Sequence, residues 1–272
     1  MIQPKISPRA VTVCRGRVEL HVQELGTGPG LVYLHPAGGL AWDPFLVELS
    51  REWTVIAPEL PGSRPRSEAD LANLPELMSV VSAYIEGLRS LGVVGAPAIG
   101  QSFGGMLAAE IAAEAPGLFN RLVMLDPIGG WVPDAPIADL WHTELADLPT
   151  LLFHDPAGPT ARAFFTFPDD AELAQQAVAG IGQALNASGQ YVDLGQDGGL
   201  FDRLTKIEEP VLLIWGEHDR LVPVRHAGEF AKRLRDARVE IVADSGHLPQ
   251  VEQSAATLQL VGSFLAEHHS VL

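Results

Sequence analysis

The sequence has little positive charge and almost no cysteine. Of its 272 residues, 18 are Lys or Arg and 34 are Asp or Glu, which gives a formal net charge of −16 at pH 7. A protein that neutralises nucleic-acid phosphates needs a basic face, so this balance argues against a nucleic-acid partner. Cys14 is the single cysteine, which excludes an intramolecular disulfide framework and a thiolate metal cluster.

Long hydrophobic runs and a targeting signal are also missing. Residues 1–10 contain Lys5, Arg9 and two prolines, but no apolar segment typical of a signal peptide. The uncharged stretch 90–109 contains five glycines and Pro97, so it is better explained as a strand, a turn and the start of a helix than as a membrane span. We therefore expect no membrane association and a cytoplasmic location.

Short apolar runs alternate with longer helical patterns along most of the chain. This alternation is typical of a largely parallel sheet with helices on both faces. An alternating segment at 18–25, followed by a glycine-rich turn, predicts an antiparallel start to the sheet. The later runs expected to be strands are 31–34, 54–57, 96–99, 122–125, 211–215 and 239–242, and the expected helices are 74–91, 102–115, 224–235 and 251–268.

One segment breaks this alternation. Residues 131–204 contain eleven acidic side chains, many aromatic residues and only two basic residues, Arg162 and Arg203. The segment has short helical patterns and no convincing strand. We expect it to form a mainly helical cap over one end of the sheet, inserted into a core made of residues 1–130 and 205–272.

A serine lies in a Gly-x-Ser-x-Gly motif between an apolar strand and an alanine-rich helix. The motif is Gly100-Gln101-Ser102-Phe103-Gly104. A sharp strand-to-helix turn strains the serine backbone, and side chains at the glycine positions would collide. The turn also places the hydroxyl at a helix N-terminus, which favours developing negative charge. We therefore predict that Ser102 is a nucleophile.

A nucleophilic serine needs a base and a carboxylate that orients the base. Among the nine histidines, His247 is the predicted base because it follows the last expected strand in a loop. His226 is instead expected to be exposed at a helix start. Asp219, in the turn after strand 211–215, is the predicted acid, and Glu217 and Asp126 are alternatives. The chain order serine, acid, histidine suits this type of sheet.

Two backbone N–H groups are candidates for holding the oxyanion of an acyl-transfer reaction. Phe103 directly follows the predicted nucleophile, and its N–H is the first donor. The second is expected in the turn His35-Pro36-Ala37-Gly38-Gly39 after the strand 31–34. Proline has no N–H, so Ala37 is the predicted donor. His35 is expected to be a structural hydrogen-bonding residue beneath this turn.

Over nearly its whole length the chain resembles the α/β-hydrolase superfamily. The matching segments are His35-Pro36-Ala37-Gly38-Gly39, Val55-Ile56-Ala57-Pro58-Glu59-Leu60-Pro61-Gly62, Gly100-Gln101-Ser102-Phe103-Gly104-Gly105, Trp215-Gly216-Glu217-His218-Asp219 with Val222-Pro223, and Ser245-Gly246-His247. The resemblance implies an α/β fold with an eight-stranded, mostly parallel sheet. It also implies an acyl-enzyme mechanism with a Ser-Asp-His triad, without a metal or an organic cofactor. The sequence has Pro36, Glu59 and Gln101 where relatives usually have glycine, aspartate and histidine.

The resemblance implies a hydrolase of a small-molecule ester or lactone with a small to medium apolar acyl group, and water as co-substrate. Leu40, Trp42, Trp131 and Trp141 are expected to line the pocket. Three alternatives are open: a carbon–carbon bond hydrolase of ring-cleavage products, in which Arg162 would hold the substrate carboxylate, an acyl-homoserine-lactone hydrolase, and a ligand-binding receptor on a hydrolase scaffold. The protein is expected to be a monomer or a homodimer.

Overall fold

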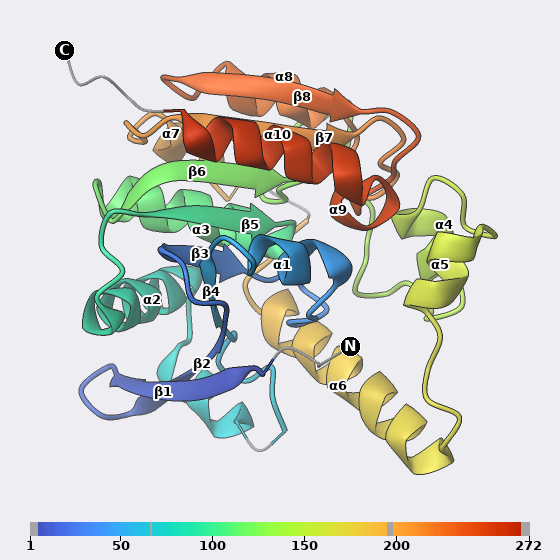
Figure 1. Cartoon of the computed structure of the whole chain (residues 1–272), viewed down its shortest axis with the longest axis horizontal. Coiled ribbons are helices and arrows are strands. Elements are labelled where there is room, and N and C mark those ends of the chain that lie inside the picture. Colours follow the sequence, from blue (N-terminus) through green and yellow to red (C-terminus); the bar gives the residue numbers. More distant parts are fainter. Residues whose placement is uncertain (1–4, 66, 195–197, 268–272) are drawn as a thin grey trace.

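The computed structural model describes residues 5–65, 67–194 and 198–267, which form one eight-stranded sheet flanked by helices (Figure 1). The strands, in chain order, are β1 (Ser7–Val13), β2 (Val18–Leu25), β3 (Gly30–Leu34), β4 (Thr54–Pro58), β5 (Ala96–Gln101), β6 (Phe119–Leu125), β7 (Val211–Gly216) and β8 (Ala237–Val242). Their order across the sheet is β1-β2-β4-β3-β5-β6-β7-β8. Strand β2 pairs antiparallel with β1 and β4, and the remaining pairs are parallel. The predicted fold class and its antiparallel start are confirmed.

Helices cover both faces of the sheet, so the central strands are buried on both sides. In β7, Leu213 and Trp215 belong to one core, whereas Leu212 and Ile214 belong to the other. This alternation follows from the two-residue period of a strand. Helices α2 (Leu77–Leu91), α3 (Phe103–Glu114) and α8 (Arg225–Ala231) contribute to the first core, and α1 (Pro44–Leu49) and α10 (Ser254–Ala266) contribute to the second (Figure 1).

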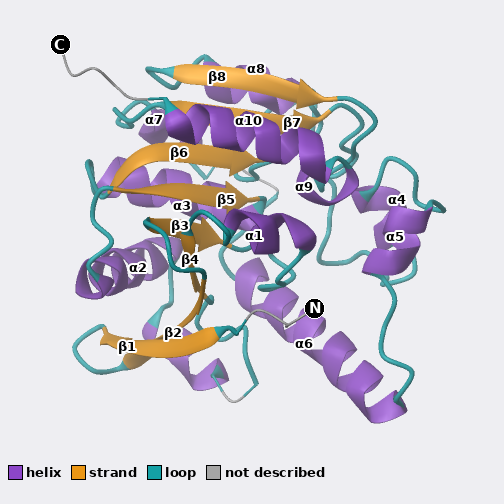
Figure 2. Ribbon diagram, in the orientation of Figure 1, coloured by secondary structure: helices purple, strands orange, loops and turns teal. Residues whose placement is uncertain are grey.

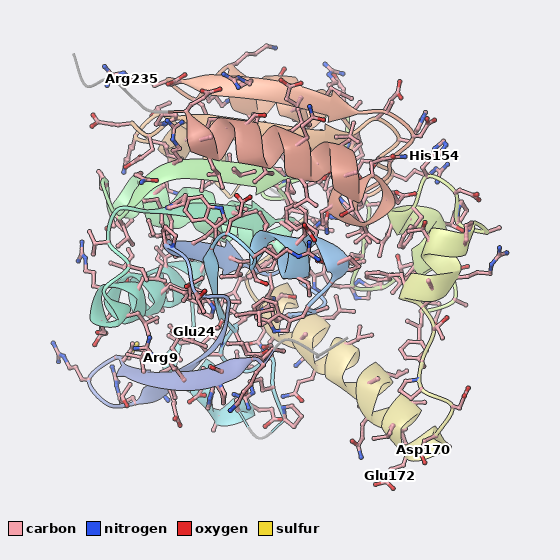
Figure 3. All side chains as sticks on the ribbon, viewed as in Figure 1. Arg9, Glu24, His154, Asp170, Glu172 and Arg235 are labelled. Carbon is pink, nitrogen blue, oxygen red and sulfur yellow. The ribbon has the colours of Figure 1, made fainter. Side chains whose placement is uncertain are left out.

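The chain between β6 and β7 contains helices and loops. These helices are α4 (Leu148–Leu152), α5 (Pro159–Phe164), α6 (Ala171–Gly189) and α7 (Leu200–Leu204). Helices α4, α5 and α6 lie beyond the carboxyl ends of the central strands (Figure 2), where open α/β sheets place their ligand sites. Asp170 caps α6 by accepting the N–H groups of Glu172 and Leu173. Both acidic residues lie at the end of α6 far from the sheet (Figure 3).

Two of the expected helices differ from the observed ones near the carboxyl end of the chain. The expected helix 224–235 ends earlier, at Ala231. The expected helix 251–268 is divided into α9 (Pro249–Glu252) and α10, because Gln253 leaves the helical conformation with φ −127° and ψ 50°. His268 lies outside the described residues. The structure also describes a short 3-10 helix, η1 (Glu68–Asn73), after β4.

The prediction that His226 is exposed is wrong. Its side chain is fully buried, and its Nε2 lies 2.7 Å from the carbonyl oxygen of Ala135. The ring also stacks against Trp215, so it belongs to the core beside β7. No helix within residues 5–65, 67–194 and 198–267 has the length and apolar character that crossing a membrane requires.

Candidate active site

Ser102 lies at the sharp turn between β5 and α3. Its backbone has φ 55° and ψ −115°, a strained conformation for a residue with a side chain. The glycines on either side permit this turn. A Cβ atom on Gly100 would lie 2.3 Å from the carbonyl oxygen of Gly104, and one on Gly104 would lie 2.0 Å from that of Leu34. The motif is therefore explained by close backbone packing.

We expect Gly104→Ala to lower the free energy of unfolding by about 1–3 kcal/mol, because β3 and α3 must separate to admit a methyl group. Chemical denaturation measures this loss. The matched control is Gly182→Ala in α6, where an added Cβ meets no atom within 4 Å. That control is expected to leave stability unchanged or to raise it slightly, because alanine favours a helix more than glycine. Equal effects of the two substitutions would contradict the packing argument.

The structure brings together the three residues predicted to form a triad. Nε2 of His247 lies 2.9 Å from Oγ of Ser102, and Nδ1 of His247 lies 2.8 Å from Oδ2 of Asp219. All three side chains are buried. They come from the ends of β5, β7 and β8, which lie in the same half of the sheet. These contacts have the geometry of a serine, a general base and an orienting carboxylate.

The two alternative acids occupy different environments. Glu217 is 51% exposed and points toward His218 rather than His247. Asp126 is fully buried, and its Oδ1 accepts the N–H of Gly216 at 2.8 Å. Burial and the neighbouring charge of Asp219 raise the pKa of the Asp126 carboxyl well above its usual range. Among the three acids, only Asp219 contacts the imidazole of His247 by a hydrogen bond in the described structure.

Asp219 is itself held by the backbone of its own turn. Its Oδ1 accepts the N–H groups of Leu221 and Val222 at 2.8 and 2.9 Å. Its other oxygen, Oδ2, faces the imidazole. Hydrogen bonds of this kind stabilise the charged form of a carboxyl group and fix its orientation. The turn therefore leaves one carboxylate oxygen directed at His247.

The loop that carries His247 is bonded to the expected cap. The N–H of His247 donates to the carbonyl oxygen of Leu152 at 2.8 Å. Glu252 accepts two N–H groups, from Gly246 at 2.6 Å and from His154 at 2.9 Å. Glu252 thus joins the histidine loop to the segment after α4. Sequence reasoning missed it, because its partners are distant in the chain and no motif marks it.

The turn after β3 contains Ala37, whose N–H is the second predicted oxyanion donor. Ala37 lines the same cavity as Ser102, and Phe103 is the first residue of α3. Among the described residues, neither N–H has a hydrogen-bond acceptor. His35 supports the turn from below, as expected: its Nδ1 lies 2.7 Å from the carbonyl oxygen of Pro36, and its Nε2 accepts the N–H of Leu60 at 2.9 Å.

A cavity of about 350 Å³ opens over Ser102. Its walls are mostly apolar, and the expected cap supplies Leu140, Leu148, Leu152, Phe164, Phe165, Ile181 and Leu185. The volume is at the small end of the roughly 300–1,000 Å³ typical of small-molecule sites. No Lys or Arg is among the described residues that line it. Arg162 is exposed on α5, outside this lining.

Of the four residues expected to line the pocket, the structure places Trp42 on this cavity. The other three lie elsewhere. Leu40 packs against the core on the α1 side of the sheet. Trp131 lines a separate cavity of about 90 Å³ beside α3. Trp141 donates its ring N–H to the carbonyl oxygen of Leu185 at 3.0 Å and packs over Gly189.

Besides Ser102 and His247, the cavity has polar lining residues that sequence reasoning did not identify. These are Tyr33, Asp43, Gln101 and Gln250. Gln101 donates its side-chain amide to the carbonyl oxygen of His247 at 3.1 Å. Asp43 caps α1, and burial raises the pKa of its carboxyl to about 6. A Ser/Asp cap before a proline signals a helix start in a sequence, but it does not show that the side chain also faces a pocket.

Comparisons with known proteins show what this chain is similar to. Residues 31–260 match the model of the Alpha/beta hydrolase family. Pyrrolizixenacetamide deacetylase of Xenorhabdus hominickii is 28% identical over 253 residues, which cover 88% of this chain and 92% of the relative. The 2-hydroxy-6-oxo-6-phenylhexa-2,4-dienoate hydrolase of Comamonas testosteroni is 25% identical over 268 residues, which cover 91% of each chain.

Solved structures share the fold at lower sequence identity. The meta-cleavage product hydrolase of Pseudomonas fluorescens IP01 superposes with a TM-score of 0.75 at 20% identity, covering 94% of this chain and 97% of that one. Naproxen esterase of Bacillus subtilis superposes with a TM-score of 0.72 at 17% identity, covering 97% and 92%. At these identities the likeness concerns the fold alone.

Proposed function

The chain belongs to the alpha/beta hydrolase family, and we propose that it cleaves a carboxylic ester or lactone of a small to medium apolar acid through an acyl-enzyme on Ser102. The observation that carries this proposal is the connected set Ser102, His247 and Asp219, with contacts of 2.9 and 2.8 Å, at the wall of an apolar cavity. A ligand-binding receptor has no need of a buried base and its orienting acid.

The reaction has two halves. His247 Nε2 takes the proton of Ser102 as Oγ attacks the substrate carbonyl carbon. The N–H groups of Ala37 and Phe103 donate hydrogen bonds to the resulting oxyanion. His247 then protonates the leaving alkoxide, and the carbon–oxygen bond breaks. In the second half His247 removes a proton from water as the water oxygen attacks the acyl carbon. His247 then returns that proton to Oγ of Ser102 as the bond between the acyl carbon and Oγ breaks and the acid is released.

Asp219 acts through His247 rather than on the substrate. Its carboxylate accepts a hydrogen bond from the Nδ1–H group of His247, which leaves the unprotonated Nε2 facing Ser102. It also stabilises the imidazolium that forms during the attack. Glu252 and Gln101 hold the backbone of the His247 loop, and we propose that they position the base.

The lining of the cavity favours a substrate whose acyl group carries no carboxylate. A ring-cleavage product is an acid, and a buried carboxylate needs a cationic or hydrogen-bonding partner. The described lining of the cavity has no Lys or Arg, and Asp43 would repel a second carboxylate. A cavity whose described lining has no Lys or Arg favours the ester or lactone reaction over carbon–carbon bond hydrolysis of an acidic substrate.

Initial rates on p-nitrophenyl esters of increasing acyl length test the proposal. We expect turnover with an optimum among short to medium acyl chains, because longer chains exceed the cavity. The p-nitrophenyl monoester of adipate is expected to have a kcat/KM at least about tenfold below that of the heptanoate ester, which corresponds to about 1.4 kcal/mol. A preference for the monoadipate would contradict the charge argument.

Other substrates distinguish the three alternative functions. If the protein hydrolyses no p-nitrophenyl ester, turnover of a ring-cleavage dienoate would identify it as a carbon–carbon bond hydrolase. Turnover of an acyl-homoserine lactone would identify it as a lactone hydrolase of that class. An acetanilide is a further substrate to compare, since one relative is named as a deacetylase. Saturable ligand binding without product from any of these substrates would support the receptor alternative.

A further inference from the structure

Asp43 is among the residues that line the cavity over Ser102 and also an adjoining cavity beside α5. Among the described residues that line either cavity, there is no Lys or Arg. The adjoining cavity contributes Pro44, Pro159, Thr160, Ala163, Phe164, Gln250, Val251 and Ser254, none of them charged. Asp43 therefore borders two cavities whose described lining supplies no Lys or Arg as a counter-charge.

Helix capping explains part of the presence of Asp43. Its Oδ1 accepts the N–H of Leu46 at 2.9 Å, which satisfies the N-terminus of α1. Serine, asparagine and threonine perform the same capping without a charge. The N-terminus of α1 also favours a carboxylate, but a neutral cap would satisfy the same N–H without burying a charge at the wall of an active-site cavity.

Other residues of the same cavity lining can accept hydrogen bonds or attract a cation. Tyr33 and Gln250 line the same cavity and offer a hydroxyl and an amide oxygen. Trp42, the preceding residue in the chain, offers an aromatic ring, which attracts cations at its face. Burial raises the pKa of the Asp43 carboxyl to about 6, so the group is mostly ionised at neutral pH.

We infer that Asp43, with Tyr33, Trp42 and Gln250 of the same cavity lining, binds an ammonium group of the substrate. This inference rests on the proposed function and narrows it: the preferred ester is apolar apart from an amine on its acyl or alcohol part. A bound ammonium would supply the missing counter-charge to Asp43. The net charge of −16 also raises the local concentration of cations around the protein.

Competition with a matched pair of inhibitors tests the inference, whichever part of the ester carries the amine. Pentylammonium and pentan-1-ol have the same chain and differ in charge. Each is added to the hydrolysis of p-nitrophenyl butanoate at pH 8. We expect the inhibition constant of pentylammonium to be about tenfold lower than that of pentan-1-ol, as for a charge-assisted contact.

Two variants locate the effect. Asp43→Asn keeps a capping side chain for α1 but removes the charge. We expect the ratio of the two inhibition constants to fall to near one in this variant, and the ratio cancels any change in overall activity. Asp134→Asn removes one charge from a side chain that is 81% exposed, and it is expected to keep the wild-type ratio. Equal loss in both variants would show a long-range charge effect and overturn the inference.

The ratio is also expected to depend on pH. Pentylammonium stays charged between pH 5 and 8, since alkyl amines titrate near about 10.4. As pH falls through about 6, Asp43 takes up a proton and the preference for the cation disappears. The other titratable groups that line the cavity are Tyr33, whose pKa burial raises, and His247. Measuring the same ratio against pH with Asp43→Asn isolates the part of the pH dependence that comes from Asp43.

The outcomes separate the inference from the proposed function. A wild type that hydrolyses p-nitrophenyl butanoate but binds both inhibitors equally overturns the inference alone. A wild type that hydrolyses no ester overturns the proposed function. In that case calorimetry with pentylammonium decides the inference: binding by wild type and not by Asp43→Asn supports it, and no binding overturns it.

Discussion

Replacing Ser102 by alanine is expected to lower kcat for p-nitrophenyl ester hydrolysis by at least about 10⁴-fold. The substitution removes Oγ, the atom that lies 2.9 Å from Nε2 of His247, and no other described hydroxyl contacts this nitrogen by a hydrogen bond. The alanine methyl group fits the same site, so the fold should be retained. Steady-state kinetics on the purified variant measures the loss, and thermal unfolding checks the fold.

The matched control is Ser82→Ala on the exposed side of α2. This substitution also removes a serine hydroxyl, one that donates only to the carbonyl oxygen of Met78. We expect it to leave kcat unchanged. If Ser102→Ala keeps more than about a tenth of the wild-type rate, a mechanism without covalent catalysis on Ser102 must replace the present one.

Replacing Asp219 by asparagine is expected to lower kcat by about 10⁴-fold. The amide oxygen of the new side chain can still accept the turn N–H groups, while its NH₂ group faces Nδ1 of His247 in place of a carboxylate oxygen. That contact favours the wrong imidazole tautomer and removes the stabilisation of the imidazolium. Kinetics at saturating ester measures the effect directly on kcat.

Asp126, the acid next to Asp219, provides the comparison variant. Asp126→Asn is expected to lower kcat by less than about tenfold, because Asp126 makes no hydrogen bond to His247 in the described structure, and burial and the charge of Asp219 raise the pKa of its carboxyl, which disfavours the charged form. An amide has the shape of a protonated carboxyl, and its oxygen can still accept the N–H of Gly216. A large loss in Asp126→Asn with a small loss in Asp219→Asn would assign the acid role to Asp126.

The features that sequence reasoning predicts best are those with a local physical cause. The apolar strands and the motif around Ser102 follow from side-chain periodicity and from the steric needs of one turn. Ser102, His247 and Asp219 each follow a strand of the parallel sheet, and parallel strands place their carboxyl ends at one edge. Their meeting in space was therefore accessible without coordinates, although their roles stay proposals.

Features that depend on packing between distant segments were not accessible in this way. His226 looks like an exposed helix residue until the carbonyl of Ala135 and the ring of Trp215 surround it. Trp131 and Trp141 look like pocket aromatics, but the path of the chain after β6 turns them elsewhere. Asp43 resembles an ordinary helix cap, because only the folded cavity shows what else it faces. In each case the deciding contact lies far away in the sequence.

Covalent labelling tests the central claim, a nucleophilic Ser102 activated by His247, most directly. The protein is incubated with a fluorophosphonate, and the modified peptide is mapped by mass spectrometry. The account predicts one phosphonyl adduct, located on Ser102, with loss of esterase activity in proportion to labelling. Labelling should be at least about 10²-fold slower in His247→Ala, because the serine then lacks its base. An active protein that forms no adduct, or forms it on another residue, would contradict the account.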